Sequence, residues 1–350
     1  MKNFKSWKGD LEEILPLLRR VALGDAVVRV FPLNDRVALG LPCDGDLAQE
    51  VVRLYRPMKW KARLFAKLLE GGARLGLIRF FKSKKIEVKE PEISWLKGLS
   101  ELGFLGCNPG HGIRCVILNR GENGALKVSK VAIGGTLDPV IKEAEKLREL
   151  SVKYRGVVAF GEAERGADWA AFWTHHAAGN GPQSLAGEGV VPLLERWLGA
   201  ETVMIGNLPW VKNLVSELVG PVRERLAGLE IRAALVHGDF TPWNLRHDGE
   251  ELVAIDWEWA REDGLAGIDL GHGLVMEAKL VKGLVGEELV EGLLKMAEEG
   301  EISAYLEQAG WEDLTLWCLL SVLYSSDQAG VELEKELRVL ENRVELRLAI

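Results

Sequence analysis

The pattern of apolar and polar residues differs between three successive parts of the chain. In residues 1–100, the stretches AVVRVF and EVVRLY are rich in β-branched residues and predict two strands. The stretch WKARLFAKLLEG has its apolar residues at helical spacing and predicts a helix that stops at Gly71 and Gly72. Lysines and arginines occupy the polar side of this helix. Such a face is either simply solvated or in contact with an anionic membrane or a phosphate-rich ligand.

Residues 101–180 have the pattern of a small antiparallel sheet with one helix. The stretch GFLGCNPGHGIRCVILNR predicts a strand, a glycine-rich turn and a second strand, and ALKVSKVAI predicts a third strand. The stretch TLDPVIKEAEKLREL predicts a helix that opens with Asp138 before Pro139. Two further strands are predicted for GVVAFGEA and DWAAFWTHH.

Helical patterns dominate the remainder of the chain, and the main strand signal among them is one hairpin. In the stretch NLRHDGEELVAID, the pair Asp248-Gly249 predicts a two-residue turn. Pairing outward from that turn places Leu245 opposite Leu252. It also brings Asp256 back beside Asn244, although twelve residues separate them in the sequence.

Length and charge indicate how these parts are organised. A chain of 350 residues exceeds the size at which one hydrophobic core is efficient, so two or three lobes are expected. Residues 1–100 contain 20 Lys and Arg against 12 Asp and Glu, whereas the rest contains 24 against 40. We therefore expect an N-terminal accessory α/β module of residues 1–100, a small lobe of residues 101–180 and a helical large lobe of residues 181–350.

Composition narrows the class of protein. Four cysteines without any CxxC spacing argue against a zinc site or a disulfide framework and favour reduced thiols in the cytoplasm. No apolar run approaches the ~18 residues of a membrane span, so no stable membrane insertion is expected. The net charge of −8 is unevenly distributed and does not by itself identify a partner, and no nucleic-acid partner is expected.

The hairpin supplies the ligands that a magnesium ion prefers. Mg²⁺ takes hard oxygen ligands and is usually held by one or two carboxylates together with substrate phosphates. Asn244 and Asp256 offer one amide oxygen and one carboxylate at the base of the hairpin. Asp239 lies five residues before Asn244, on the loop that enters the hairpin, where a base for a hydroxyl nucleophile would be needed.

These residues resemble a known catalytic core. The pattern H-x-D-x-x-x-x-N, followed by an apolar strand and an aspartate, resembles that of protein-kinase-like phosphotransferases. The wording HGDFTPWNL with IDWEWA is most similar to the aminoglycoside phosphotransferase and choline kinase branch. The resemblance implies a bilobal α+β fold, with a small antiparallel-sheet lobe and a mostly helical large lobe. It also implies that Asp239 is the catalytic base, that His237 supports the loop, and that Asn244 and Asp256 hold Mg²⁺. Asp269, in GLAGIDL, is then expected to brace the loop.

A kinase also has to hold ATP, and the small lobe contains residues suited to that task. The predicted register places Lys130 opposite Cys115, at the end of its strand near the glycines of the glycine-rich turn. Glu143 interrupts the apolar face of the following helix, and a buried carboxylate needs a partner, for which Lys130 is the candidate. The backbone of Gly106, Gly110 and Gly112 is expected to approach the phosphates, although the turn lacks a strict GxGxxG pattern. Leu245 and Ile255, which flank the metal residues, are candidates for the floor of the adenine pocket.

The expected function is ATP- and Mg-dependent transfer of the γ-phosphoryl group to a hydroxyl of a small molecule, such as an amino sugar, a sugar or a choline-like alcohol. The alternative from another class is a non-catalytic nucleotide-binding scaffold or regulator on the same fold. A protein kinase is disfavoured, because no Ala-Pro-Glu segment follows Asp256 and too few residues separate it from Asp269 for a long peptide-docking loop. The acceptor stays open: the acidic large lobe favours a cation, whereas the basic N-terminal module favours an anionic or membrane-borne partner.

Overall fold

The chain forms two compact units. The computed structural model describes residues 16–24, 26, 28–32, 38–55, 60–80, 90–99, 101–106, 113–121, 123–135, 137–218 and 220–348. The first unit comprises residues 1–152 and 158–178, and the second comprises residues 153–157 and 179–350. The first is built on an antiparallel sheet and the second is mostly helical, so the expected mixed fold class is confirmed.

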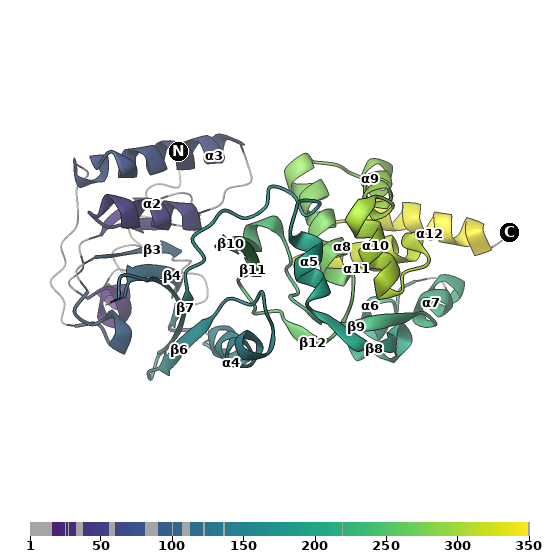
Figure 1. Cartoon of the computed structure of the whole chain (residues 1–350), viewed down its shortest axis with the longest axis horizontal. Coiled ribbons are helices and arrows are strands. Elements are labelled where there is room, and N and C mark those ends of the chain that lie inside the picture. Colours follow the sequence, from purple (N-terminus) through teal and green to yellow (C-terminus); the bar gives the residue numbers. More distant parts are fainter. Residues whose placement is uncertain are drawn as a thin grey trace. The chain divides into compact units, whose positions relative to one another are not determined.

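A seven-stranded sheet forms the first unit (Figure 1). Its strands are β1 (Arg29–Pro32), β2 (Ala38–Leu41), β3 (Leu102–Gly106), β4 (Ile113–Arg120), β5 (Leu126–Ile133), β6 (Phe160–Arg165) and β7 (Trp169–His175). They lie in the order β1-β2-β3-β4-β5-β7-β6, and every neighbouring pair is antiparallel. Because β2 pairs with β3, the accessory module expected for residues 1–100 contributes two strands to the sheet of the expected small lobe.

Successive side chains along a strand of this sheet point to opposite faces, and each face has its own core. Ile117 points into a core with Phe104 and Val131, whereas the next residue, Leu118, points into a core with Leu39. The helices and helical turns of this unit are η1 (Arg19–Leu23), α2 (Gly45–Leu54), α3 (Trp60–Arg74), η2 (Leu77–Phe80), η3 (Ser94–Leu96) and α4 (Asp138–Lys153). Apolar residues of α2 pack into the second core, which places α2 against the sheet.

For the first hundred residues, one predicted strand is wrong, and one predicted helix is present but ends later than expected. The stretch EVVRLY belongs to helix α2 and is not a strand. Asp44 caps the start of the helix, because its carboxylate accepts the backbone N–H groups of Asp46 and Leu47. This cap together with the one-sided burial outweighs the β-branched valines. The predicted helix of WKARLFAKLLEG is confirmed as α3, but it continues through Gly71 and Gly72 to Arg74.

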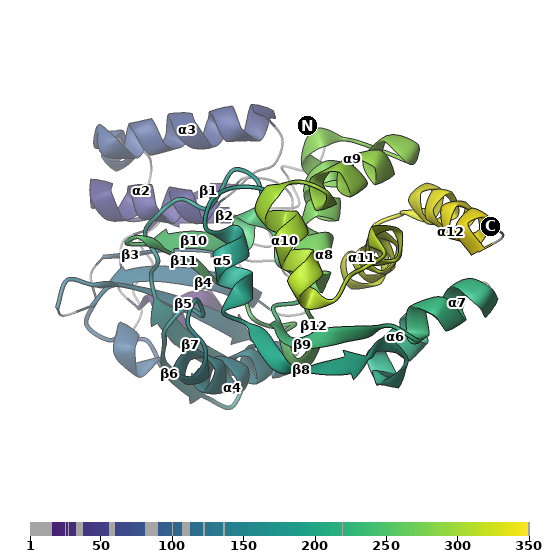
Figure 2. The ribbon, with the colours of Figure 1, turned by 45° about the vertical axis from the view of Figure 1, so that its right-hand side comes forward.

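The second unit contains more strand than its sequence pattern indicates. A three-stranded sheet has the order β12-β9-β8, formed by β8 (Leu198–Met204), β9 (Glu230–Val236) and β12 (Arg261–Leu265) (Figure 2). The expected hairpin is present as β10 (Leu245–Asp248) and β11 (Glu251–Ala254). The helices and helical turns are α5 (Val190–Glu195), η4 (Ile205–Asn207), α6 (Pro209–Leu214), α7 (Gly220–Ala227), η5 (Pro242–Asn244), α8 (Ile268–Met276), η6 (Glu277–Lys282), α9 (Glu287–Ala297), α10 (Gly300–Ala309), α11 (Leu314–Ala329) and α12 (Glu334–Leu348).

Candidate active site

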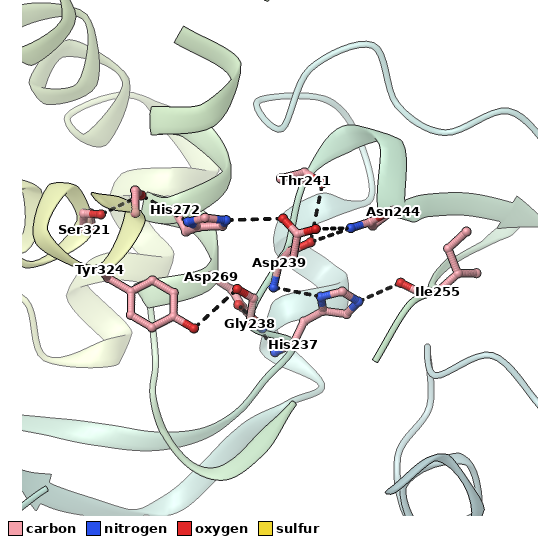
Figure 3. A network of polar contacts seen from close by, with 11 residues as sticks. His237, Gly238, Asp239, Thr241, Asn244, Ile255, Asp269, His272, Ser321 and Tyr324 are labelled. Atoms are coloured by element: carbon pink, nitrogen blue, oxygen red, sulfur yellow. Dashed lines mark hydrogen bonds and ion pairs between the residues drawn. The ribbon is translucent and has the colours of Figure 1, made fainter. Parts of the chain in front are cut away.

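The loop that leaves β9 is held by a buried carboxylate. Asp269, the second residue of α8, accepts the backbone N–H of His237 at 2.6 Å and that of Gly238 at 3.0 Å (Figure 3). Burial raises the pKa of the Asp269 carboxyl, while the two backbone donors act in the opposite direction. Gly238 has φ of +91°, and a Cβ atom there would lie 2.6 Å from the Cβ of Trp259. The geometry therefore agrees with the bracing role that the resemblance implies for Asp269.

This bracing leads to a prediction about stability. We expect Asp269→Ala to lower the free energy of unfolding by about 2–4 kcal/mol, because it leaves two buried N–H groups without an acceptor. Urea denaturation of the purified chain measures the change. Asp263→Ala, which removes an exposed carboxylate from β12, is the matched control and should change stability by less than about 0.5 kcal/mol. Equal stabilities of the two variants would show that Asp269 does not brace the loop.

His237 is fully buried and both its ring nitrogens contact the backbone. Nε2 lies 2.8 Å from the carbonyl oxygen of Ile255, and Nδ1 accepts the N–H of Asp239 at 3.2 Å. Because a carbonyl only accepts, Nε2 is the nitrogen that carries the proton. The ring also packs 4.6 Å from that of Trp257, which is itself fully buried. This arrangement ties the loop to the end of the hairpin and is what a supporting residue requires.

Asp239 and Asn244 form the centre of the loop. The side-chain amide of Asn244 donates to the carbonyl oxygen of Asp239 at 2.9 Å and to its Oδ2 at 2.8 Å. The Asn244 Oδ1 is then the polar atom of this side chain that can bind a cation. The carboxylate of Asp239 is one-third exposed, so it is accessible to a ligand while its orientation is fixed by Asn244.

Asp256 follows the hairpin, and the residue before it is bonded to the backbone of Asn244. The N–H of Ile255 donates to the carbonyl oxygen of Asn244 at 2.9 Å, which joins the two ends of the hairpin one residue before Asp256. Asp256 has φ of +71° and is the non-glycine residue with positive φ in the described part of the chain. Such a conformation is unfavourable for a residue with a Cβ, and it is often found at functional sites.

The predicted register of this hairpin is wrong by two residues. Leu245 pairs with Ala254 and not with Leu252, and Asp248 is the last paired residue, opposite Glu251. The turn therefore consists of Gly249 and Glu250. Of these two only Gly249 has positive φ, which is the requirement of a turn with glycine in its first central position. A shift of two residues leaves each side chain on its predicted face, so Asp256 still returns to Asn244.

The donors at this position fit a magnesium ion. Asn244 and Asp256 supply an amide oxygen and a carboxylate, the hard ligands that Mg²⁺ takes together with substrate phosphates. In the described ranges, no group of three or more His, Cys, Asp and Glu side chains is arranged to bind a metal ion by itself. The magnesium site at Asn244 and Asp256 stays a prediction.

His272 was missed by the sequence interpretation. It is fully buried in α8, and its Nε2 lies 3.4 Å from Oδ1 of Asp239. Its Nδ1 lies 3.1 Å from the hydroxyl of Ser325 in α11, and that hydroxyl contacts the carbonyl oxygen of Ser321 (Figure 3). The two oxygens of the Asp239 carboxylate are thus contacted from opposite sides, by Asn244 and by His272. No spacing rule links two residues 33 positions apart, so only the fold reveals this contact.

The first unit contains the predicted lysine–glutamate pair. Lys130 in β5 donates to both carboxylate oxygens of Glu143, at 2.6 and 2.8 Å, and Glu143 is buried on the apolar face of α4. The predicted register is wrong by one residue, because Lys130 lies opposite Val116 and not Cys115. The loop that connects the two strands has five residues and is closed by the N–H of Gly121, which donates to the carbonyl oxygen of Ala125, and this loop sets the register.

The remaining residues that were predicted to contact the nucleotide are three glycines, Leu245 and Ile255. Gly106 ends β3 with φ of +129°, and a Cβ there would lie 2.7 Å from the carbonyl oxygen of Arg114. Gly110 and Gly112 lie outside the described residues. Leu245 is fully buried, whereas Ile255 keeps part of its surface exposed. Of these two, Ile255 is therefore the one with surface available to a ligand.

Comparison with known proteins finds similar solved structures but no similar sequence. No protein-family model and no curated protein sequence matches it. Among solved structures it is similar to a thermostable mutant of aminoglycoside phosphotransferase APH(4)-Ia in complex with AMP-PNP and hygromycin B, at 14% identity and a TM-score of 0.42. That match covers 73% of this chain and 95% of the other.

Two further solved structures show a similar level of likeness. Plasmodium vivax ethanolamine kinase is 11% identical with a TM-score of 0.41, covering 70% of this chain and 81% of the other. A putative fructosamine-3-kinase from Haemophilus somnus is 9% identical with a TM-score of 0.37, covering 67% of this chain and 87% of the other. These three solved structures are, by their descriptions, an aminoglycoside phosphotransferase, an ethanolamine kinase and a putative fructosamine-3-kinase.

Proposed function

We propose that this protein is an ATP- and Mg-dependent phosphotransferase that transfers the γ-phosphoryl group of ATP to a hydroxyl of a small molecule. One observation carries the proposal. The side-chain amide of Asn244 donates two hydrogen bonds to Asp239, and the backbone carbonyl oxygen of Asn244 accepts the N–H of Ile255, the residue before Asp256. Short contacts thereby join the residue that we assign as the base to one proposed metal ligand, Asn244, and to the backbone next to the other, Asp256. Phosphoryl transfer needs little more from a protein than such positioning together with neutralisation of charge.

Each residue has a separate task in this reaction. Asp239 accepts or orients the proton of the acceptor hydroxyl, and its partly exposed carboxylate suits that role. Asn244 and Asp256 would hold Mg²⁺, which when bound neutralises charge on the phosphates. Lys130, held by Glu143, binds the α and β phosphates. His237 and Asp269 keep the loop in place.

A direct test is ADP release by the purified chain with Mg-ATP and a panel of amino sugars, simple sugars, choline and ethanolamine. We expect at least one acceptor to stimulate ADP release, and the activity to disappear when Mg²⁺ is chelated. A thermal-shift measurement with ATP, with and without Mg²⁺, reports binding separately. ATP binding without product for any acceptor would favour the non-catalytic scaffold, and the absence of ATP binding would contradict both functions.

His272 is expected to position the base in this reaction. His272→Leu removes the contact with Oδ1 of Asp239, so we expect kcat to fall about tenfold while the KM for ATP stays unchanged. His272→Gln retains an N–H donor and should recover part of the loss. Steady-state kinetics at saturating ATP, together with thermal midpoints, distinguish this outcome from general destabilisation. A rise in the KM for ATP with kcat preserved would assign His272 a different role.

A further inference from the structure

Helix α3 packs on the first unit along one side only. Leu69 and Ala73 of α3 join the core that α2 forms with the sheet, and Glu70 forms an ion pair with Arg53 of α2 at 2.8 Å. In both views α3 runs beside α2, on the side of α2 that faces away from the sheet (Figures 1 and 2). Its opposite side is therefore turned away from the core of this unit.

That opposite side is apolar. Leu64 is 52% exposed, Leu68 is 69% exposed and Leu75 is 72% exposed. Leu64 and Leu68 are four residues apart and lie on one face of α3, and Leu75 follows in the turn after the helix ends at Arg74. Leu77 and Phe80 of η2 are exposed as well, and so is Phe65, which is four residues before Leu69 and borders the packed side of α3. We call Leu64, Leu68, Leu75, Leu77 and Phe80 the outer face of α3, which continues past the end of the helix into η2. Single exposed leucines are common on protein surfaces, but an apolar row of this length is not.

The same segment is strongly basic. Residues 59–85 contain nine lysines and arginines and a single acid, Glu70, in a chain whose net charge is −8. Lys67 and Arg74 are exposed on α3 itself, beside the leucines. An exposed apolar row bordered by cations is the pattern of a helix that lies in the plane of an anionic membrane surface.

We propose that the outer face of α3 binds the surface of a bilayer that contains anionic phospholipids. The leucines enter the boundary between headgroups and acyl chains, and Lys67 and Arg74 contact the anionic headgroups. Within the described ranges, no helix has both the length and the apolar composition needed to cross a bilayer, so the contact is with one leaflet.

The charges beside the outer face of α3 favour a lipid bilayer over other binding partners. Two copies of this face brought together would place their cations close to one another, which disfavours a symmetric dimer. A dissolved phosphate compound would neutralise Lys67 and Arg74 but would leave the leucines in water. An anionic bilayer satisfies both the charges and the apolar surface. This inference does not depend on the proposed phosphotransferase activity.

The test is co-sedimentation of the full chain with vesicles of phosphatidylcholine alone and of phosphatidylcholine with about one third phosphatidylglycerol. We expect binding to the anionic vesicles only, weakened by added salt. Leu68→Glu should lower the partition coefficient about tenfold or more, and Lys67→Glu with Arg74→Glu should do the same. Leu346→Glu is the matched control, because Leu346 on α12 is 67% exposed and lies outside the outer face.

The outcomes separate clearly. Because each substituted side chain is exposed, the thermal midpoints of the variants should match that of the unmodified chain. Absence of binding to anionic vesicles, or equal losses in Leu68→Glu and Leu346→Glu, would overturn the proposal. So would a concentration-dependent dimer in light scattering that Leu68→Glu abolishes, since the face would then bind a second copy.

Discussion

Asp239→Asn is expected to lower the rate of phosphoryl transfer by about two to four orders of magnitude, since an amide cannot accept the proton of the acceptor hydroxyl. The substitution preserves the size of the side chain and the backbone contacts of the loop. Asn244 and Asp256 remain in place, so the affinity for Mg-ATP should change little. Rates of ADP release at saturating ATP and acceptor measure the first effect, and titration calorimetry with an ATP analogue measures the second.

Asp248→Asn is the control for this experiment. Asp248 is exposed at the tip of the same hairpin. Replacing it removes one carboxylate charge and tests whether loss of a negative charge alone lowers turnover. We expect normal rates from the control. If Asp239→Asn also turned over normally, Asp239 would not be the base, and the proposed reaction would lose its central residue.

Asp256→Asn is expected to remove the increase in nucleotide affinity that Mg²⁺ provides and to lower turnover by about two to three orders of magnitude. The reason is that the neutral amide is a much weaker ligand for a hard divalent cation than a carboxylate. Asparagine tolerates positive φ better than most residues, so the backbone at +71° should persist. Calorimetric titration with ATP in the presence and absence of Mg²⁺ isolates this contribution.

Two companion variants separate the metal from the backbone. Asp256→Gly and Asp256→Ala both remove the carboxylate and should lose Mg-dependent binding equally. Their stabilities should differ, because alanine is strained at positive φ and glycine is not, by about 1 kcal/mol in urea denaturation. Mg-dependent ATP binding that survives in all three variants would exclude Asp256 as a metal ligand.

Local patterns in the sequence determined several features of this protein. The Asp-Gly pair predicted that the chain reverses between Asn244 and Asp256, and the helical spacing around Glu143 predicted that this acid is buried and needs a partner. Both depend on short-range rules, turn chemistry and periodicity, which act within a few residues of the chain. The same rules predicted a part rich in strands followed by a part rich in helices, and the resemblance to kinase-like phosphotransferases implied the bilobal fold.

Tertiary contacts decided the rest. The conformation of Gly249 set which residues form the hairpin turn. The closure of a five-residue loop set which residue of β4 lies opposite Lys130. Burial of one side of α2 made a helix of a valine-rich stretch that reads as a strand. The contact of His272 with Asp239 exists only because α8 packs beside the catalytic loop.

The outer face of α3 shows the same division between sequence and structure. Periodicity indicated an amphipathic helix, but a helix with apolar residues around most of its circumference offers more than one side to a core. Packing on α2 buried Ala73, partly buried Leu69 and left Leu64 and Leu68 exposed. Sequence patterns therefore determined which residues have the required chemistry, whereas burial, which depends on distant parts of the chain, decided which of them meet and which face outward.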